Sequence, residues 1–345
     1  MEQSDSNSHC CRIVVDAMGG DYAPQNAVLG AIQAAAEDPS ITLILVGKED
    51  EIRKVITANN VSYDKFQIVN ADQVITMSDS PVKSIVAKKN SSIVVGVNLV
   101  KDKKADAFVS AGNTGAVMAA STMILGKIPG VDRPTIGTFM PSQNEVTTIF
   151  DVGASVDSKP SHLLEYAVMG SIFVREIYGV ENPSVGLLSV GEEESKGNEV
   201  TKAAFKLLKN TRLNFIGNIE GRDIFGGRVN VVVCDGFIGN ILLKFAESII
   251  GLLRHKFTLF AGRSFMNKIR VGMMKGTFKK VVKEFDPQMY GGVPLLGVNA
   301  ISIIGHGSSS VLAIKNMVHR AKEMHDKNLI QKIEESLKEY ADISE

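Results

Sequence analysis

Two basic side chains stand in glycine-rich segments where their chemistry can be used. Lys196 lies within Gly191–Asn198, and its ammonium group can hold a phosphate as a point charge. The alternative is a surface lysine paired with Glu193 or Glu194. His306 lies between two glycines, where an imidazole can move a proton or bond a phosphate oxygen. The alternative is a turn histidine that the backbone satisfies.

Amides and carboxylates occupy similar positions. Asn113 and Asn240 stand close to predicted helix starts, where an amide either caps the helix or donates to an oxyanion or phosphate. Asp16 follows an apolar run and precedes Gly19 and Gly20. A magnesium site is conceivable at four carboxylates, but carboxylates at strand ends commonly cap helices, so we assign no metal: Asp16, Asp21, Asp151 and Asp235.

Several common catalytic motifs are missing from the sequence. It has no P-loop, no H-E-x-x-H, no C-x-x-C and no G-x-S-x-G nucleophile elbow. The six histidines are scattered, which argues against zinc, and we expect no cofactor. The three cysteines, Cys10, Cys11 and Cys234, are too few for a disulfide framework and indicate a reducing compartment. These residues alone predict an α/β enzyme that acts on a phosphate-bearing substrate.

The elements that must position these residues follow one pattern. A short apolar run leads into a glycine-rich turn, and a helix-like stretch comes next. The runs are Arg12–Val15, Ile41–Val46, Ala107–Val109, Val185–Ser189, Val229–Val233 and Ile301–Ile304. This alternation predicts a doubly wound, mostly parallel sheet with helices on both faces. Ligands of such sheets bind at the carboxyl ends of the strands, where these turns must lie.

Composition limits the class of protein. The 345 residues include 38 Lys+Arg and 38 Asp+Glu, and this zero net charge argues against a nucleic-acid binder. The N-terminal residues lack the apolar core of a signal peptide, so we expect a cytoplasmic protein. We expect a disordered tail at 1–11, a catalytic α/β domain at 12–330 and a terminal helix or tail at 331–345.

One segment departs from the neutral balance. Residues 248–283 contain no Asp or Glu, although basic and bulky apolar residues alternate through them. The segment predicts two amphipathic helices over 248–285, joined around Gly262–Phe265 or Gly272–Gly276. Such a segment suits an anionic membrane surface. An acidic protein partner and a core helix pair with a solvated basic face are the alternatives.

The motifs resemble one known family. In chain order they are Val15–Pro24, Ser110–Ala116, Asp151–Ala154, Gly191–Asn198, Phe215–Arg222, Asp235–Asn240 and Tyr290–Gly297. Together they resemble the PlsX-type phosphate acyltransferases, the fatty acid/phospholipid synthesis proteins, over Arg12 to about Ala321. Four positions depart from the family pattern: Ser155 and Ser189 replace asparagines, and Ile304-Gly305 replaces the Lys-Ser expected before His306. The last change puts a basic contact near His306 in doubt.

The resemblance implies a fold, a reaction and partners. The fold is an α/β/α sandwich like that of isopropylmalate dehydrogenases. Orthophosphate attacks the thioester of a long-chain acyl–acyl carrier protein, giving acyl phosphate and free carrier protein. The acyl phosphate feeds a downstream glycerol-3-phosphate acyltransferase. Members form homodimers that associate peripherally with the membrane.

On this resemblance we assign catalytic roles to four residues, Lys196, Asn240, His306 and Asp16. The residues expected to bind substrate or phosphate are Gly19, Gly20, Asn113, Thr114, Gly115, Gly197, Asn198, Asp235, Gly236 and Gly239. Those expected to contact the membrane or the carrier protein are Arg254, Lys256, Phe265, Lys268, Arg270, Met273, Met274, Lys275, Lys279 and Lys280.

Three other functions compete with this assignment. A CoA-dependent phosphate acyltransferase differs only in the thiol carrier. A decarboxylating dehydrogenase of the same fold needs an arginine cluster that the sequence does not show. A non-catalytic adaptor would dock the carrier protein at the membrane without turnover.

Overall fold

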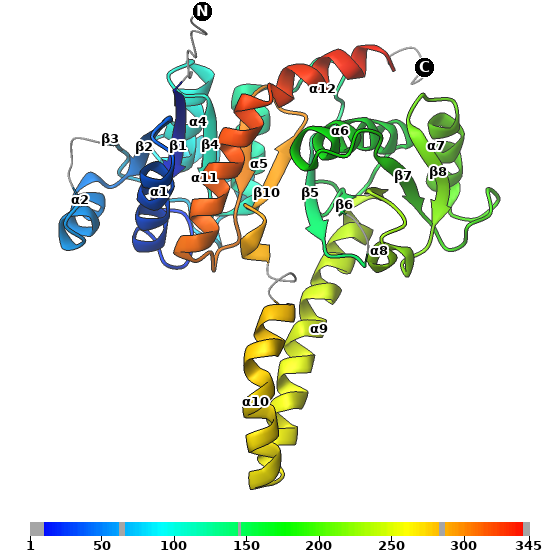
Figure 1. Cartoon of the computed structure of the whole chain (residues 1–345). Helices are drawn as coiled ribbons and strands as arrows, with labels where there is room; N and C mark the ends of the chain where they lie inside the picture. The colour runs from blue at the N-terminus through cyan, green and yellow to red at the C-terminus, as the bar shows by residue number, and fades with distance from the viewer. Residues whose placement is uncertain (1–9, 62–65, 144–145, 283–286, 341–345) are drawn as a thin grey trace, which may run out of the picture. The chain divides into compact units, whose positions relative to one another are not determined.

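The computed structural model describes residues 10–61, 66–143, 146–282 and 287–340 (Figure 1). The chain divides into two compact units. Unit 1 comprises Met1–Pro134 and Tyr290–Ala341, and unit 2 centres on Thr135–Met289. The expected tail lies mostly outside the described residues, since only residues 10 and 11 of it are described. The domain boundaries drawn from the sequence stay a prediction.

Unit 1 is built on a mostly parallel sheet. The strands run in the order β3 (Phe66–Asn70), β2 (Ile41–Gly47), β1 (Cys11–Asp16), β4 (Ala107–Ser110), β11 (Ile301–Ile304) and β10 (Val293–Leu296). Successive pairs from β3 to β11 are parallel, whereas β10 is antiparallel to β11. Four of the predicted strands form this sheet.

The helices of unit 1 pack on that sheet or on one another. They are α1 (Gln25–Glu37), α2 (Glu49–Ala58), α3 (Pro81–Ala87), α4 (Ser92–Lys101), α5 (Thr114–Ala120), α11 (Val311–Asp326) and α12 (Leu329–Lys338), with a π-helical turn at Ser121–Leu125. A Cβ on Gly30 of α1 would lie 2.6 Å from Ile314 Cβ of α11. Glycine therefore lets these two helices approach.

Unit 2 contributes five strands among the described residues. Their order is β5 (Thr135–Met140), β6 (Thr147–Phe150), β9 (Val231–Val233), β7 (Ser184–Leu188) and β8 (Asn214–Ile219). The pairs from β6 to β8 are parallel, and β5 is antiparallel to β6. Its helices are α6 (Pro160–Tyr178), α7 (Glu199–Lys209), α8 (Asp223–Gly226), α9 (Gly236–Gly262) and α10 (Phe265–Val282), and a 3₁₀ turn spans Pro287–Met289.

The predicted mixed α/β class with a mostly parallel sheet is confirmed. The two antiparallel pairs are not foreseen by the strand–turn–helix pattern. They arise where successive strands have no helix between them: β5 and β6 are separated only by residues 141–146. Without a crossover helix, consecutive strands pair antiparallel.

The basic segment lies in α9 and α10, which run side by side and project from the strands of unit 2 (Figure 1). The rings of Phe257 and Phe278 meet between them, with centroids 4.8 Å apart. Helix α9 ends at Gly262 and α10 begins at Phe265, which confirms the predicted join between the two helices. The alternative join at Gly272–Gly276 is wrong, because α10 continues through both glycines. By length and composition α9 could cross a membrane.

Candidate functional site

The turns after three neighbouring strands of unit 1 meet at one edge of its sheet. These strands are β1, β4 and β11, which are parallel. The backbone N–H of Asp21 donates to Gly307 O at 2.7 Å, and Gly305 N donates to Ser110 O at 2.8 Å. The first and last motifs of unit 1 are thus tied together, as expected for the carboxyl edge of a parallel sheet.

Asp16 lies at the base of these turns and is buried. Its Oδ2 accepts a hydrogen bond from Ser110 Oγ at 2.7 Å, and its Oδ1 accepts from Met18 N at 3.0 Å. Burial raises the pKa of Asp16 in spite of these bonds. A Cβ on Gly19 would lie 2.7 Å from Asp16 Oδ2, so this close approach requires glycine. Asp16 therefore hydrogen-bonds both the turn after β1 and Ser110 at the end of β4, and so fixes their positions.

His306 is exposed at the same edge. Its Nδ1 lies 2.7 Å from Ser308 Oγ and accepts a bond from Ser308 N at 3.2 Å. A neutral ring that accepts at Nδ1 carries its proton on Nε2. Gly20, with φ +103°, packs against Gly307 beside this histidine. The structure therefore brings together Asp16, Gly19, Gly20 and His306.

Asn113 is a cap and an anchor for a neighbouring loop. Its Oδ1 accepts from Ala116 N at 3.0 Å, the capping alternative considered from the sequence. Its Nδ2 donates to three carbonyl oxygens, those of Thr76, Met77 and Asp79, at 3.0–3.3 Å. With the side chain engaged in this way, the groups left for an anion are the backbone N–H groups of the first turn of α5, at Thr114 and Gly115.

Unit 2 has a corresponding turn after β6. Asp151 is fully buried and accepts backbone bonds from Ile136, Gly153, Ala154 and Ser155 at 2.7–3.3 Å. Burial raises its pKa, although these four bonds oppose the shift.

The first turn of α9 rests on this loop. A Cβ on Gly236 would overlap the Asp151 carboxylate, and one on Gly239 would overlap the Asp151 carbonyl oxygen. Asp235 caps α9, since its Oδ1 accepts from Ile238 N at 2.9 Å. Asn240 is exposed and lies beside Gly153, whose added Cβ would sit 3.6 Å from Asn240 Cγ. The helix start, Asn240 and the Asp151 loop therefore form one surface.

Lys196 lies in the exposed loop after β7. Its Nζ pairs with no acid among the described residues. Glu194 instead pairs with Lys209 at 3.0 Å, and Glu192 pairs with Arg228 at 3.2 Å. The alternative pairing of Lys196 with Glu193 or Glu194 is therefore not formed, and the ammonium group of Lys196 stays available. Asn198 caps α7 by accepting from Thr201 N at 2.8 Å, and Gly197 has φ +102°.

The sequence predicts no site role for three polar residues, Ser110, Asn218 and Ser189. Ser110 donates to Asp16. Asn218 is buried and donates from Nδ2 to Glu193 O at 2.9 Å, within the loop of Lys196. Asn218 Oδ1 and Ser189 Oγ are buried without a hydrogen-bond partner among the described residues. Each of the three lies in or beside a motif, but only the fold shows which backbone it faces.

Other clusters do not form a comparable site. Cys11, Asp106 and His325 have ligand atoms within 4.8 Å of one another, but Arg12 already pairs with Asp106 at 2.8 Å. Burial raises the pKa of Cys11 to about 12 and that of Cys234 well above its ordinary value, so neither is an activated thiol.

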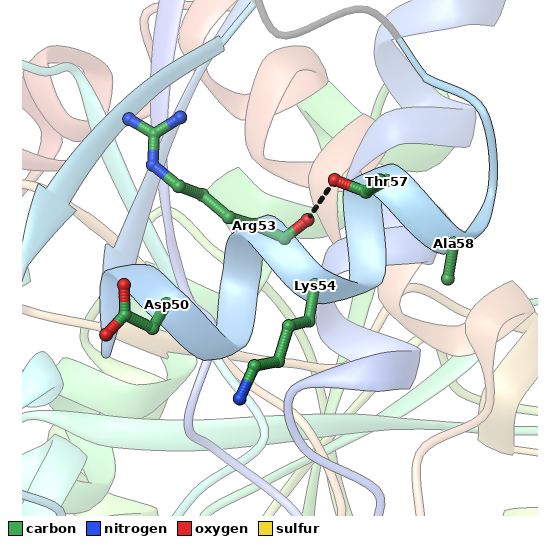
Figure 2. A pocket seen from close by; sticks show the side chains of 5 residues that line it. All are labelled: Asp50, Arg53, Lys54, Thr57 and Ala58. Carbon is green, nitrogen blue, oxygen red and sulfur yellow. Dashed lines mark hydrogen bonds between the residues drawn. The ribbon is translucent and has the colours of Figure 1, made fainter.

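The open hollow in Figure 2, about 550 Å³, is lined by one helix, α2. Its lining residues are Asp50, Arg53, Lys54, Thr57 and Ala58. Thr57 Oγ1 bonds Arg53 O at 2.9 Å, and no lining residue comes from a second element.

Comparison with known proteins identifies relatives of this chain. The family described as "Fatty acid synthesis protein" matches residues 11–332. The phosphate acyltransferase of Halothermothrix orenii is 46% identical over 332 residues, which are 94% of this chain and 98% of the relative. That of Pelotomaculum thermopropionicum is 47% identical over 326 residues, covering 94% and 95%.

Solved structures share the fold at low sequence identity. The EutD phosphotransacetylase from Staphylococcus aureus superposes with a TM-score of 0.62 at 19% identity, over 91% of this chain and 94% of that one. A 4-hydroxythreonine-4-phosphate dehydrogenase from Klebsiella pneumoniae gives a TM-score of 0.52 at 11% identity, over 93% and 99%. These likenesses concern the fold alone.

Proposed function

Since the chain belongs to the fatty acid synthesis protein family, we propose that it transfers a long-chain acyl group from acyl carrier protein to orthophosphate. The family assignment confirms the predicted class of enzyme, a phosphate acyltransferase of fatty acid and phospholipid synthesis. The products are acyl phosphate and free carrier protein, and the acyl phosphate supplies a downstream glycerol-3-phosphate acyltransferase.

One observation carries the choice of nucleophile. In unit 1, the serine hydroxyl at the end of β4 is already engaged, and the two buried thiols of the chain are protonated. Ser110 Oγ donates to Asp16, the buried thiol of Cys234 has a raised pKa, and the thiol of Cys11, also with a raised pKa, lies at the opposite end of β1 from the turn. In contrast, the turns present an unpaired ammonium group at Lys196 and a helix start at Thr114. Such groups bind an anion, which supports phosphate, the nucleophile that the family assignment implies, as the attacking group.

The reaction balances without a cofactor. A phosphate oxygen attacks the thioester carbonyl, a C–O bond forms, and the tetrahedral intermediate collapses with cleavage of the C–S bond. The thiolate leaves and takes a proton. Because a thiol has a pKa of about 8.5, this leaving group needs little acid assistance. Catalysis then depends on positioning and on stabilising negative charge.

The proposed roles follow from the geometry within each unit. In unit 2, Lys196 neutralises phosphate or the developing oxyanion, and Asn240 orients the carbonyl or phosphate. In unit 1, the N–H groups of Thr114 and Gly115 bind phosphate, and the Nε2 proton of His306 bonds a phosphate oxygen. Asp16 acts through the turns it holds. We assign it, with Asn113 and Asn198, to positioning.

The helix pair α9–α10 is the proposed membrane contact. Phe265 and Met273 are each 79% exposed, and Met274 is 55% exposed. Among the described residues of α10, Lys268, Arg270 and Lys275 are exposed too, while the side chain of Lys279 lies outside the described ones. Exposed apolar and basic side chains together suit an anionic lipid surface. We propose a cytoplasmic homodimer that associates peripherally with the membrane through this pair.

Acyl phosphate trapping tests the reaction. The purified protein is mixed with palmitoyl–carrier protein and orthophosphate, and hydroxylamine converts acyl phosphate to hydroxamate. We expect hydroxamate only when protein and phosphate are both present. Equal product without phosphate, or none with it, rejects the function. Palmitoyl-CoA in place of the carrier thioester separates the CoA-dependent alternative, which predicts the larger rate with CoA.

Lys196→Ala tests the main charged role. Loss of one charge-assisted contact in the transition state lowers kcat by about 100-fold. Lys202→Ala, an exposed lysine on α7, is the control and keeps wild-type turnover. Circular dichroism establishes that both variants fold. A folded Lys196→Ala variant with unchanged kcat removes Lys196 from the catalytic site.

A further inference from the structure

Helix α3 and the loop before it present an apolar and basic face to solvent. Met77 is 52% exposed, Val82 54% and Val86 59%. Lys83 and Lys89 are exposed beside them. We call these five residues the α3 face. Exposed apolar side chains that lie together on one face are a feature of interaction surfaces on globular proteins.

The α3 face adjoins the turns proposed to bind phosphate in unit 1. A Cβ on Gly115 would lie 2.6 Å from Pro81 Cγ, so the start of α3 touches the first turn of α5. Asn113 holds the loop that carries Met77 through bonds to the Thr76, Met77 and Asp79 carbonyls. Met77 Cε lies 2.8 Å from the position of a Cβ on Gly307, next to His306.

The charge on this face is not compensated. Neither Lys83 nor Lys89 pairs with an acid among the described residues. The neighbouring Lys88 differs, because its Nζ lies 2.5 Å from Asp79 Oδ2 and 2.9 Å from Val74 O. Two free positive charges that flank apolar side chains complement a protein surface of acidic and apolar residues.

We infer that the α3 face docks the acidic acyl carrier protein that delivers the thioester. This inference rests on the proposed function, and it places the carrier beside the turns that its thioester must reach. The small face fits a partner that binds and leaves in each cycle. A stable dimer buries about 800 Å² on each partner, which a seven-residue helix and one loop do not supply. Lipid headgroups are recognised by clusters of about four to eight basic residues, and the α3 face has two.

The test reverses the two free charges with Lys83→Glu and Lys89→Glu in one variant. We expect the KM for palmitoyl–carrier protein to rise about tenfold with kcat retained, since exposed interface charges act mainly on association. Fluorescence anisotropy with labelled carrier protein that lacks the acyl group should show a similar loss of affinity. The difference in carrier-protein affinity between the variant and the wild type should become smaller as salt is added, because salt screens the charges.

Two further variants sharpen the result. Lys101→Glu with Lys104→Glu reverses two exposed lysines that lie just before β4, at the opposite edge of the sheet, and should leave KM and affinity unchanged. Val82→Ser with Val86→Ser tests the apolar part and should weaken carrier binding without a change in net charge.

The inference fails if the α3 variants turn over and bind the carrier protein as the wild type does. It also fails if they instead change the sedimentation mass, which identifies a second copy as the occupant, or lose binding to anionic vesicles, which identifies lipid. A wild type that forms no acyl phosphate overturns the proposed function first. Carrier binding in the anisotropy assay then still decides the docking site.

Discussion

Each unit has a buried aspartate at the end of a strand, but the two carboxylates are held in different ways. Asp16 in unit 1 accepts a hydroxyl bond from Ser110, which comes from the neighbouring strand. Asp151 in unit 2 accepts four backbone N–H bonds, three of them from its own loop. Both have raised pKa values because they are buried.

The difference shows where each turn is vulnerable. In unit 1 the Asp16 carboxylate accepts side-chain hydrogen bonds from Ser110 on β4 and Ser92 on α4, and only Ser110 links two strands, so a conservative change of Ser110 should loosen the edge. In unit 2 the bonds come from the backbone, and side-chain deletions should matter less. What unit 2 cannot accept is added bulk, since the glycines of α9 touch the Asp151 loop.

The largest effect should come from Gly239→Ala. The new methyl group would overlap the Asp151 carbonyl oxygen, and backbone must move to admit it. We expect the free energy of unfolding to fall by about 3 kcal/mol or more. Gly251→Ala on the same helix is the matched control, because a Cβ there meets no atom within 4 Å.

Alanine in an exposed helix interior is better than glycine, so Gly251→Ala should raise stability by about 0.5–1 kcal/mol. Urea denaturation measures both variants. Similar effects of the two substitutions would show that the start of α9 does not rest on the Asp151 loop.

The next largest effects on stability should come from two serine-to-alanine substitutions, one in each unit. Ser110→Ala removes one of the two hydroxyl donors of a buried carboxylate and should cost about 1–3 kcal/mol. It should also lower kcat, because the turns of unit 1 share this bond. Ser155→Ala leaves the backbone bond from Ser155 N to Asp151 intact and loses only hydroxyl contacts to Ser158 and Tyr166. Its cost should be about 1 kcal/mol. A larger loss of stability for Ser155→Ala than for Ser110→Ala would contradict the proposed difference in how Asp16 and Asp151 are held.

The smallest effect is a change of stability with pH. The pKa of Asp16 is raised above 3.8 in the folded protein, so the folded state binds this proton more tightly than the unfolded chain does. Stability contributed by the protonated group is present below pH 3.8 and is lost as pH rises through the folded pKa. Relative to Asp16→Asn, the wild type should therefore gain stability on acidification through that window.

Asp106 gives the opposite sign and serves as the control. Burial opposes its ionisation, but hydrogen bonds from Arg12 outweigh burial and lower its pKa. Its contribution is present above pH 3.8 and is lost as pH falls through the folded pKa. Thermal denaturation of Asp16→Asn and Asp106→Asn from pH 3 to 7 compares them. Two curves of the same sign would contradict the assignment.

The sequence predicts which residues lie at the carboxyl ends of the strands better than it predicts the hydrogen bonds that their side chains make. Apolar runs followed by glycine turns place Asp16, His306 and Lys196 at strand ends, because a parallel sheet forces that arrangement. The pattern does not predict that the Asn113 amide donates hydrogen bonds to a loop nearly 40 residues earlier in the chain. It also does not predict that Ser110 donates a hydrogen bond to Asp16. These contacts depend on which strands become neighbours. The pattern also does not predict the antiparallel strands β5 and β10, because no glycine turn and helix follow them.

The most direct measurement of the central claim follows the oxygen atoms of phosphate. Palmitoyl–carrier protein is incubated with the protein and with orthophosphate that carries ¹⁸O at all four positions. Mass spectrometry then measures the mass of the acyl phosphate formed. Attack by a phosphate oxygen on the thioester carbonyl keeps all four labels, including the bridging one, and releases one carrier thiol per product. An acyl phosphate with three labels, or thioester loss that does not depend on phosphate, would contradict orthophosphate as the nucleophile.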